Sequence, residues 1–95
     1  MQNDFIHVYG VTWCGDCRRA MRFFDLNNIH YQWTNIDHDR SGEEFVIRVN
    51  KGFRSVPTIV FPDGSILVEP SNDQLAVKIQ AIRDIMTAPK DGSHE

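Results

Sequence analysis

The stretch VTWCGDCRRA, residues 11–20, contains both cysteines of the chain, three positions apart. A β-branched and aromatic run at residues 5–9 precedes it and ends at a glycine, which predicts a short strand. From Cys17 to Phe24 the apolar residues recur at helical spacing, so we expect a helix from Cys14 to about Asn27. The cysteine pair therefore lies where a strand passes into a helix.

Five further elements are predicted downstream of this helix, and four of them lie before residue 70. Residues 31–37 alternate well enough for a second strand, and Ser41 before Gly-Glu-Glu predicts a capped helix that ends near Asn50. Residues 58–61 and 66–68 predict two strands joined by a Pro-Asp-Gly-Ser turn. Because proline donates no ladder hydrogen bond, Pro57 belongs at the entrance of the third strand.

A last helix should begin at the Ser71-Asn72-Asp73 capping signal and end at Pro89. We expect residues 1–88 to form one domain and residues 89–95 to be a disordered tail. The apolar stripe of this helix is the most regular in the sequence and consists of Leu75, Ile79, Ile82 and Met86.

The predicted order is β-α-β-α-β-β-α, an α/β fold with a four-stranded mixed sheet flanked by helices. The first two strands should be parallel, because a helix joins them, and the last two should form an antiparallel hairpin. The Cys14 loop then leaves the carboxyl end of the first strand, where open α/β sheets usually place their chemistry.

Composition narrows the classes of function. The 95 residues carry a formal charge of −3, with 41% hydrophobic and 24% charged residues. This balance is typical of a soluble globular protein and gives no general attraction to nucleic acid or to an anionic membrane. The sequence shows no membrane-spanning run and no signal peptide, so we expect a cytoplasmic protein, working as a monomer.

The position of Cys14 favours an ionised sulfur. The start of a helix has unpaired N–H groups and a partial positive charge, and Arg18 and Arg19 follow within one turn. Cys17, on the apolar face, should ionise less readily and suits a resolving thiol. Asp16 opposes ionisation of its neighbours, and we expect it to point to solvent.

Three other interpretations of the cysteine pair stay open at this point. A structural disulfide would close too short a ring to constrain the chain much. A zinc site needs about four ligands, and histidines would have to complete it, since a second Cys-x-x-Cys is absent. The pair could also be inert core cysteines, although Trp13 and Gly15 indicate an exposed turn. Redox chemistry is favoured over these three. The four histidines are His7, His30, His38 and His94.

Three motifs in order resemble the glutaredoxin family of the thioredoxin fold. They are WCGDC at residues 13–17, RSVPT at residues 54–58, and PDGS followed by PSNDQL before the last helix. The resemblance covers about residues 5–86, and within the family it is greatest for the mycoredoxins of actinobacteria. Glutathione-specific members commonly have Cys-Pro-Tyr-Cys, whereas this chain has Gly15-Asp16, which favours mycothiol over glutathione.

The resemblance implies that Cys14 is the nucleophile and Cys17 the resolving partner. It also implies a cis peptide bond before Pro57, with the backbone of Val56 pairing with the bound substrate, and Arg54 holding a carboxylate of the small thiol. Trp13 is expected to form a wall of the groove. The far end of the groove would be lined by Ser71, Asn72 and Asp73, at a helix start that suits anions.

We therefore predict an enzyme, a thiol–disulfide oxidoreductase that reduces mixed disulfides between proteins and a small thiol, with mycothiol as co-substrate and no tightly bound cofactor or metal. The first alternative is a dithiol protein-disulfide reductase fed by a flavoprotein such as thioredoxin reductase. An iron–sulfur module that shares Cys14 between two subunits and a non-catalytic adaptor are the others.

Overall fold

The structure is a computed structural model that describes residues 5–86, without the side chains of the last three. The observed order of elements is the predicted β-α-β-α-β-β-α. Pro89 and the predicted tail at residues 89–95 lie outside the described residues, so the domain end at residue 88 stays a prediction. The elements are β1 (Ile6–Gly10), α1 (Gly15–Leu26), β2 (Tyr31–Asn35), α2 (Arg40–Val49), β3 (Thr58–Val60), β4 (Ile66–Val68) and α3 (Asn72–Met86).

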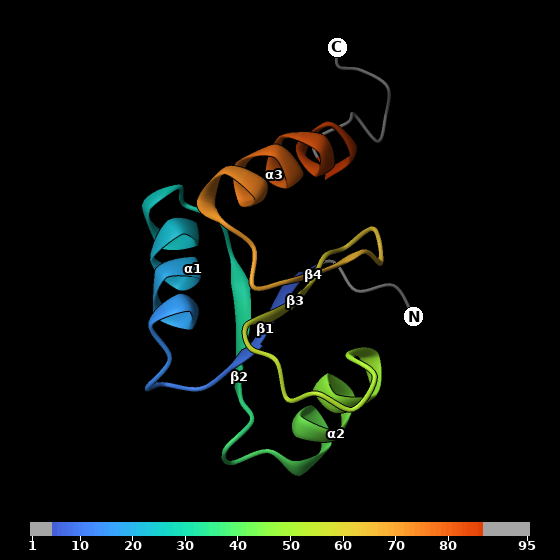
Figure 1. The fold of residues 1–95 in the computed structure, drawn as a ribbon. Helices are drawn as coiled ribbons and strands as arrows, with labels where there is room; N and C mark the ends of the chain where they lie inside the picture. Colours follow the sequence, from blue (N-terminus) through green and yellow to red (C-terminus); the bar gives the residue numbers. More distant parts are fainter. Residues whose placement is uncertain (1–4, 87–95) are drawn as a thin grey trace.

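The four strands form one mixed sheet in the order β2-β1-β3-β4 (Figure 1). β1 and β2 are parallel, with Val8 opposite Trp33, whereas β3 runs antiparallel to β1 and to β4. The parallel pair and the hairpin both confirm the sequence prediction. This topology brings the carboxyl ends of β1, β2 and β4 to the same end of the sheet as the start of β3.

Helices cover both faces of the sheet. α1 and α3 lie on one side and α2 on the other (Figure 1). Within β1, Ile6 and Val8 are buried under α1 and α3, whereas His7 and Tyr9 are half-buried on the α2 side. The larger core joins strand residues to the apolar stripes of both helices: Ile6, Val8, Ala20, Phe24, Ile59, Phe61, Leu75, Ile79 and Ile82.

Two predicted boundaries differ from the structure for local reasons. β2 ends at Asn35 rather than at residue 37, because Asn35 accepts hydrogen bonds from the N–H groups of Asp37 and His38 and so turns the chain. The predicted Ser41 cap is wrong. Asp39 caps α2 and accepts from the Gly42 N–H at 2.8 Å, while the Ser41 hydroxyl donates to the same carboxylate.

The start of α3 is a capping box. The Ser71 hydroxyl accepts from the Gln74 N–H at 3.1 Å, and the Gln74 side chain accepts from the Ser71 N–H at 2.8 Å. The predicted cap is thus confirmed, as is the burial of Leu75, Ile79 and Ile82; the side chain of Met86 lies outside the described ones. Within residues 5–86, every helix is too short or too polar to span a bilayer.

Candidate functional site

Cys14 is the N-cap residue of α1, directly after the β1 loop. Its backbone is extended, with φ −93° and ψ 120°, and its Sγ accepts from the Cys17 N–H at 3.2 Å. Its side chain is half-buried and partly exposed to solvent. The predicted position of Cys14 at the start of the helix is thus confirmed, and the start of a helix carries unpaired N–H groups.

Cys17 is sealed inside the fold, one turn further along α1. Its side chain is 0% exposed, and its Sγ lies so close to Gly10 that a methyl group there would be 2.5 Å away. Burial, followed by its hydrogen bond with Cys14, raises the pKa of the Cys17 thiol to about 12. Cys17 therefore stays a neutral thiol at physiological pH, which confirms the predicted difference in burial.

The arginines after Cys17 have defined partners. Arg18 donates to the Thr12 carbonyl at 2.9 Å. Arg19 reaches across to the loop before α3, where it donates to the Pro70 carbonyl at 2.9 Å and to Asn72 Oδ1 at 2.8 Å. Within α1, Arg19 also contacts Asp16 at 3.4 Å, and the Asp16 carboxylate is exposed as expected. Arg19 thus ties the helix of the cysteines to the start of α3.

A four-residue network stands on the other side of Cys14. Trp13, 69% exposed, donates its indole N–H to Asp37 Oδ2 at 2.8 Å. Arg54 donates to Asp37 Oδ1 and to Glu43 Oε2, both at 2.7 Å. The two acidic partners raise the pKa of Arg54, with Glu43 first, and Arg54 and then Trp13 lower the pKa of Asp37. Arg54, predicted to hold a carboxylate of the small thiol, is therefore held by carboxylates of its own chain.

Val56 and Pro57 complete this side of the site. The peptide bond between them is cis, as the resemblance implied. Val56 and Cys14 pack against the same small core of Val11, Ile36 and Val46, which brings the two loops together. Pro57 is buried, and its carbonyl accepts from the Glu69 N–H at 2.9 Å. In the described part of the chain the Val56 backbone forms no hydrogen bond.

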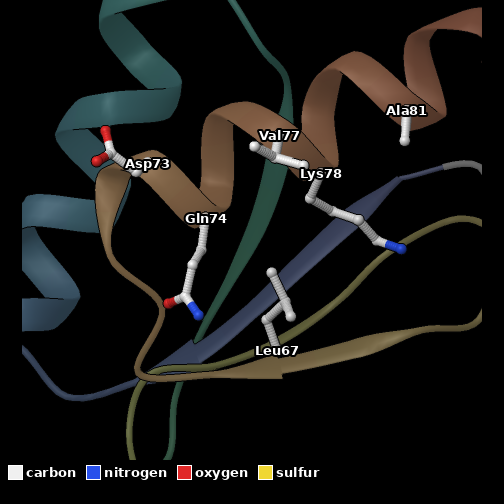
Figure 2. Close-up of a pocket in the computed structure, with 6 residues that line it drawn as sticks. All are labelled: Leu67, Asp73, Gln74, Val77, Lys78 and Ala81. Carbon is white, nitrogen blue, oxygen red and sulfur yellow. The ribbon is translucent and has the colours of Figure 1, made fainter.

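Ser71, Asn72 and Asp73 are joined to the site less directly. Ser71 is engaged in its capping box, and Asn72 is linked to α1 through Arg19. Asp73 is exposed at the edge of a groove of about 510 Å³ between α3 and β4. In this groove Gln74 and Lys78 reach toward the strands, and Leu67 points back toward α3 (Figure 2). Neither cysteine lines this groove.

The alternative uses of the cysteines can be compared with this geometry. Cys14 and Cys17 are free thiols here. In residues 5–86, no three His, Cys, Asp or Glu side chains are grouped as ligands for a metal ion, and His7 is hydrogen-bonded to Thr34 at 2.8 Å. His94 lies outside the described residues.

Comparison with known proteins shows the family to which this chain belongs. The family model described as glutaredoxin matches residues 6–66, which include β1, both cysteines and the cis-proline loop. The chain belongs to the glutaredoxin family. This glutaredoxin is thus a thiol–disulfide oxidoreductase, and its three helices and four-stranded mixed sheet form a thioredoxin-like fold.

Three relatives illustrate the similarity. This glutaredoxin is 43% identical over 75 residues to a Mycobacterium tuberculosis protein named as a glutaredoxin, a match that covers 79% of this chain and 89% of the relative. It is 31% identical over 77 residues to mycoredoxin 1 of Corynebacterium glutamicum, covering 81% and 95%. Among solved structures, the thioredoxin-like protein BC3987 has a TM-score of 0.67 at 24% identity, covering 76% and 96%.

Two residues of the site were missed by sequence reasoning. Asp37 and Glu43 carry no motif, and in the sequence they are ordinary acids of a turn and of a first helical turn. The available signal was indirect: Asp37 is the last residue of the predicted second strand, at the same sheet end as the Cys14 loop. In this glutaredoxin Asp37 connects Trp13 to Arg54, and Glu43 accepts a second hydrogen bond from Arg54.

Proposed function

We propose that this protein reduces mixed disulfides between proteins and a small thiol, with mycothiol favoured, through Cys14. The Cys14 thiolate attacks the sulfur of the small thiol; a bond forms between these two sulfurs as the mixed disulfide breaks, and the reduced protein leaves as a thiolate. A second small thiol then attacks the adduct, regenerates Cys14 and leaves as the symmetrical small-thiol disulfide. Sulfur bonds and electrons balance over the two steps.

The contrast between the two sulfurs carries this proposal. Cys14 is half-buried at a helix N-cap and accepts an N–H, whereas Cys17 is fully buried with a pKa near 12. A thiol that stays protonated attacks slowly, because the thiolate is the nucleophile. The first attack therefore belongs to Cys14, and a second small thiol competes well with Cys17 for the adduct. Cys17 is the resolving partner only when its buried sulfur is deprotonated.

The surroundings of Cys14 suit an extended substrate. The unpaired Val56 backbone lies next to Cys14 across their shared core, and the exposed Trp13 ring forms a wall held by Asp37. Arg54 supports that wall by donating to the same Asp37 carboxylate, and buried Pro57 shapes the loop. We assign Ser71, Asn72 and Asp73 to the far end of the substrate groove that begins at Cys14. Arg19 ties the start of their helix, α3, to α1.

Mycothiol is favoured as the small thiol on the likeness to mycoredoxin 1 and on the Gly15-Asp16 pair between the cysteines. We further propose that the protein acts as a cytoplasmic monomer on disulfide-bearing proteins. A flavoprotein disulfide reductase would return electrons to the small thiol and not to Cys14 itself.

A side-by-side assay tests the proposal. The wild-type protein is given a mixed-disulfide substrate with mycothiol and its reductase, with glutathione and its reductase, or with thioredoxin reductase alone, and NADPH oxidation is followed. We expect mycothiol to give the highest rate, Cys14→Ser to abolish it and Cys17→Ser to keep a good part of it. Equal loss in the two variants, or full turnover with thioredoxin reductase alone, would replace the proposal with the dithiol reductase.

A further inference from the structure

Both carboxylate oxygens of Asp37 are engaged beside the reactive sulfur. Oδ2 accepts from the indole of Trp13, the residue before Cys14, and Oδ1 accepts from the guanidinium of Arg54. Arg54 is two residues before Val56, which packs on the same core as Cys14. The Asp37–Arg54 pair therefore forms part of the wall that a small thiol bound to Cys14 would meet.

Glu43 occupies a second edge of the same guanidinium. Its Oε2 accepts from Arg54 Nε at 2.7 Å, while Asp37 accepts from the terminal nitrogen at 2.7 Å. Two carboxylates against one guanidinium leave this cluster with a net charge of −1. The edge of Arg54 formed by Nε and Nη2, which could hold an incoming carboxylate with two parallel bonds, is already divided between two internal partners.

A similar situation holds at the other end of the site. Arg19 donates to the Pro70 carbonyl, to Asn72 and, at 3.4 Å, to Asp16. Its guanidinium is thereby committed to holding the start of α3. The two arginines that connect the loops around Cys14 are thus both engaged within the protein.

We propose that Asp37 and Glu43 determine small-thiol specificity: by holding Arg54 between them, they deny the site a free guanidinium and select against thiols that carry carboxylates. Glutathione carries two carboxylates, whereas mycothiol is a hydroxyl-rich sugar conjugate without one. A negatively charged wall repels the first and leaves the second unaffected. The inference rests on the proposed function, because it requires Cys14 to be the sulfur that exchanges.

Two disulfides of different charge test this directly. Reduced Cys17→Ser protein is mixed with glutathione disulfide or with the neutral 2-hydroxyethyl disulfide, and the change in Trp fluorescence is followed in a stopped-flow instrument. In each case the Cys14 thiolate bonds to one sulfur of the disulfide and the other sulfur leaves as a thiolate. We divide the rate constant for glutathione disulfide by the rate constant for 2-hydroxyethyl disulfide. A low value of this ratio means strong discrimination against carboxylates.

In this background we expect Glu43→Gln to raise that ratio by about fivefold, the effect of about one surface ion pair. Glu44→Gln is the matched control, since it removes the same charge one residue away and Glu44 has no ion pair with Arg54. Adding Arg54→Gln to Glu43→Gln should cancel the gain, because the freed guanidinium is what binds the carboxylate.

The outcomes separate the two proposals. The specificity inference is overturned if Glu43→Gln leaves the ratio unchanged, or if Glu44→Gln raises it equally. In that case normal exchange with the neutral disulfide would still support the role of Cys14. A gain that persists without Arg54 also overturns it. Failure of Cys14 to react with either disulfide would instead remove the proposed function, and the inference with it.

Discussion

Gly10→Ala offers a sharp test of how Cys17 is held. Gly10 ends β1 and is buried, and a Cβ there would meet Cys17 Sγ at 2.5 Å and the Trp33 ring at 3.0 Å. Neither neighbour can yield freely, because Cys17 is 0% exposed and Trp33 packs against the core. Overpacking of this kind costs about 1–3 kcal/mol of unfolding free energy.

The measurement is thermal unfolding of the reduced protein. For a domain of this size each 1 kcal/mol lowers Tm by about 4–8 °C, so we expect Gly10→Ala to lower it by at least about 4 °C. Gly15→Ala is the matched control: its Cβ meets nothing within 4 Å and it begins α1, so it should be neutral or stabilise by about 0.4–1 kcal/mol.

A double-mutant cycle identifies the sulfur as the cause. Cys17→Ala removes the nearest contact and leaves only Trp33 near the new methyl group, so Gly10→Ala should cost less in that background. Equal costs in the two backgrounds, or a Gly10→Ala protein as stable as Gly15→Ala, would refute the packing of Cys17 against β1.

Three further predictions concern pH and capping. Burial raises the pKa of Cys17 to about 12 from a usual value near 9. The contribution of the neutral thiol to stability is therefore present below pH 9 and is lost as pH rises toward 12. Urea midpoints of the reduced wild type should fall more steeply over that range than those of Cys17→Ala. Asp39→Ala should lower the urea midpoint of unfolding, and Ser41→Ala should lower it clearly less, since Asp39 is the cap. The bonds from Ser65, and then from Lys78, lower the pKa of Asp63 to about 2, so the stability advantage over Asp63→Asn should be full above about pH 4 and shrink toward pH 2; an advantage that is constant with pH would contradict the pairing.

Sequence reasoning was most successful where local chemistry decides the structure. The helical spacing after Cys14, the turn of residues 62–65 and the capping box at Ser71 each depend on neighbours within a few positions. The order of elements then fixed the parallel pair and the hairpin through general rules of connection.

Tertiary contacts account for what was missed. Asp37 meets Trp13 across 24 positions and Arg54 across 17, distances at which no local pattern links them. The α2 cap was ambiguous because both Asp39 and Ser41 are good capping residues. The turn that ends β2 at Asn35 settles the choice, since it brings Asp39 to the helix start.

The central claim is that Cys14 takes up the small thiol, and a trapped adduct tests it most directly. In Cys17→Ser the chain has one cysteine left, so any disulfide it forms involves Cys14. The reduced variant is mixed with a peptide–mycothiol mixed disulfide, quenched with acid and weighed by intact mass spectrometry. We predict a protein heavier by one mycothiol and a free peptide thiol; an adduct carrying the peptide instead, or an unmodified protein, would contradict the account.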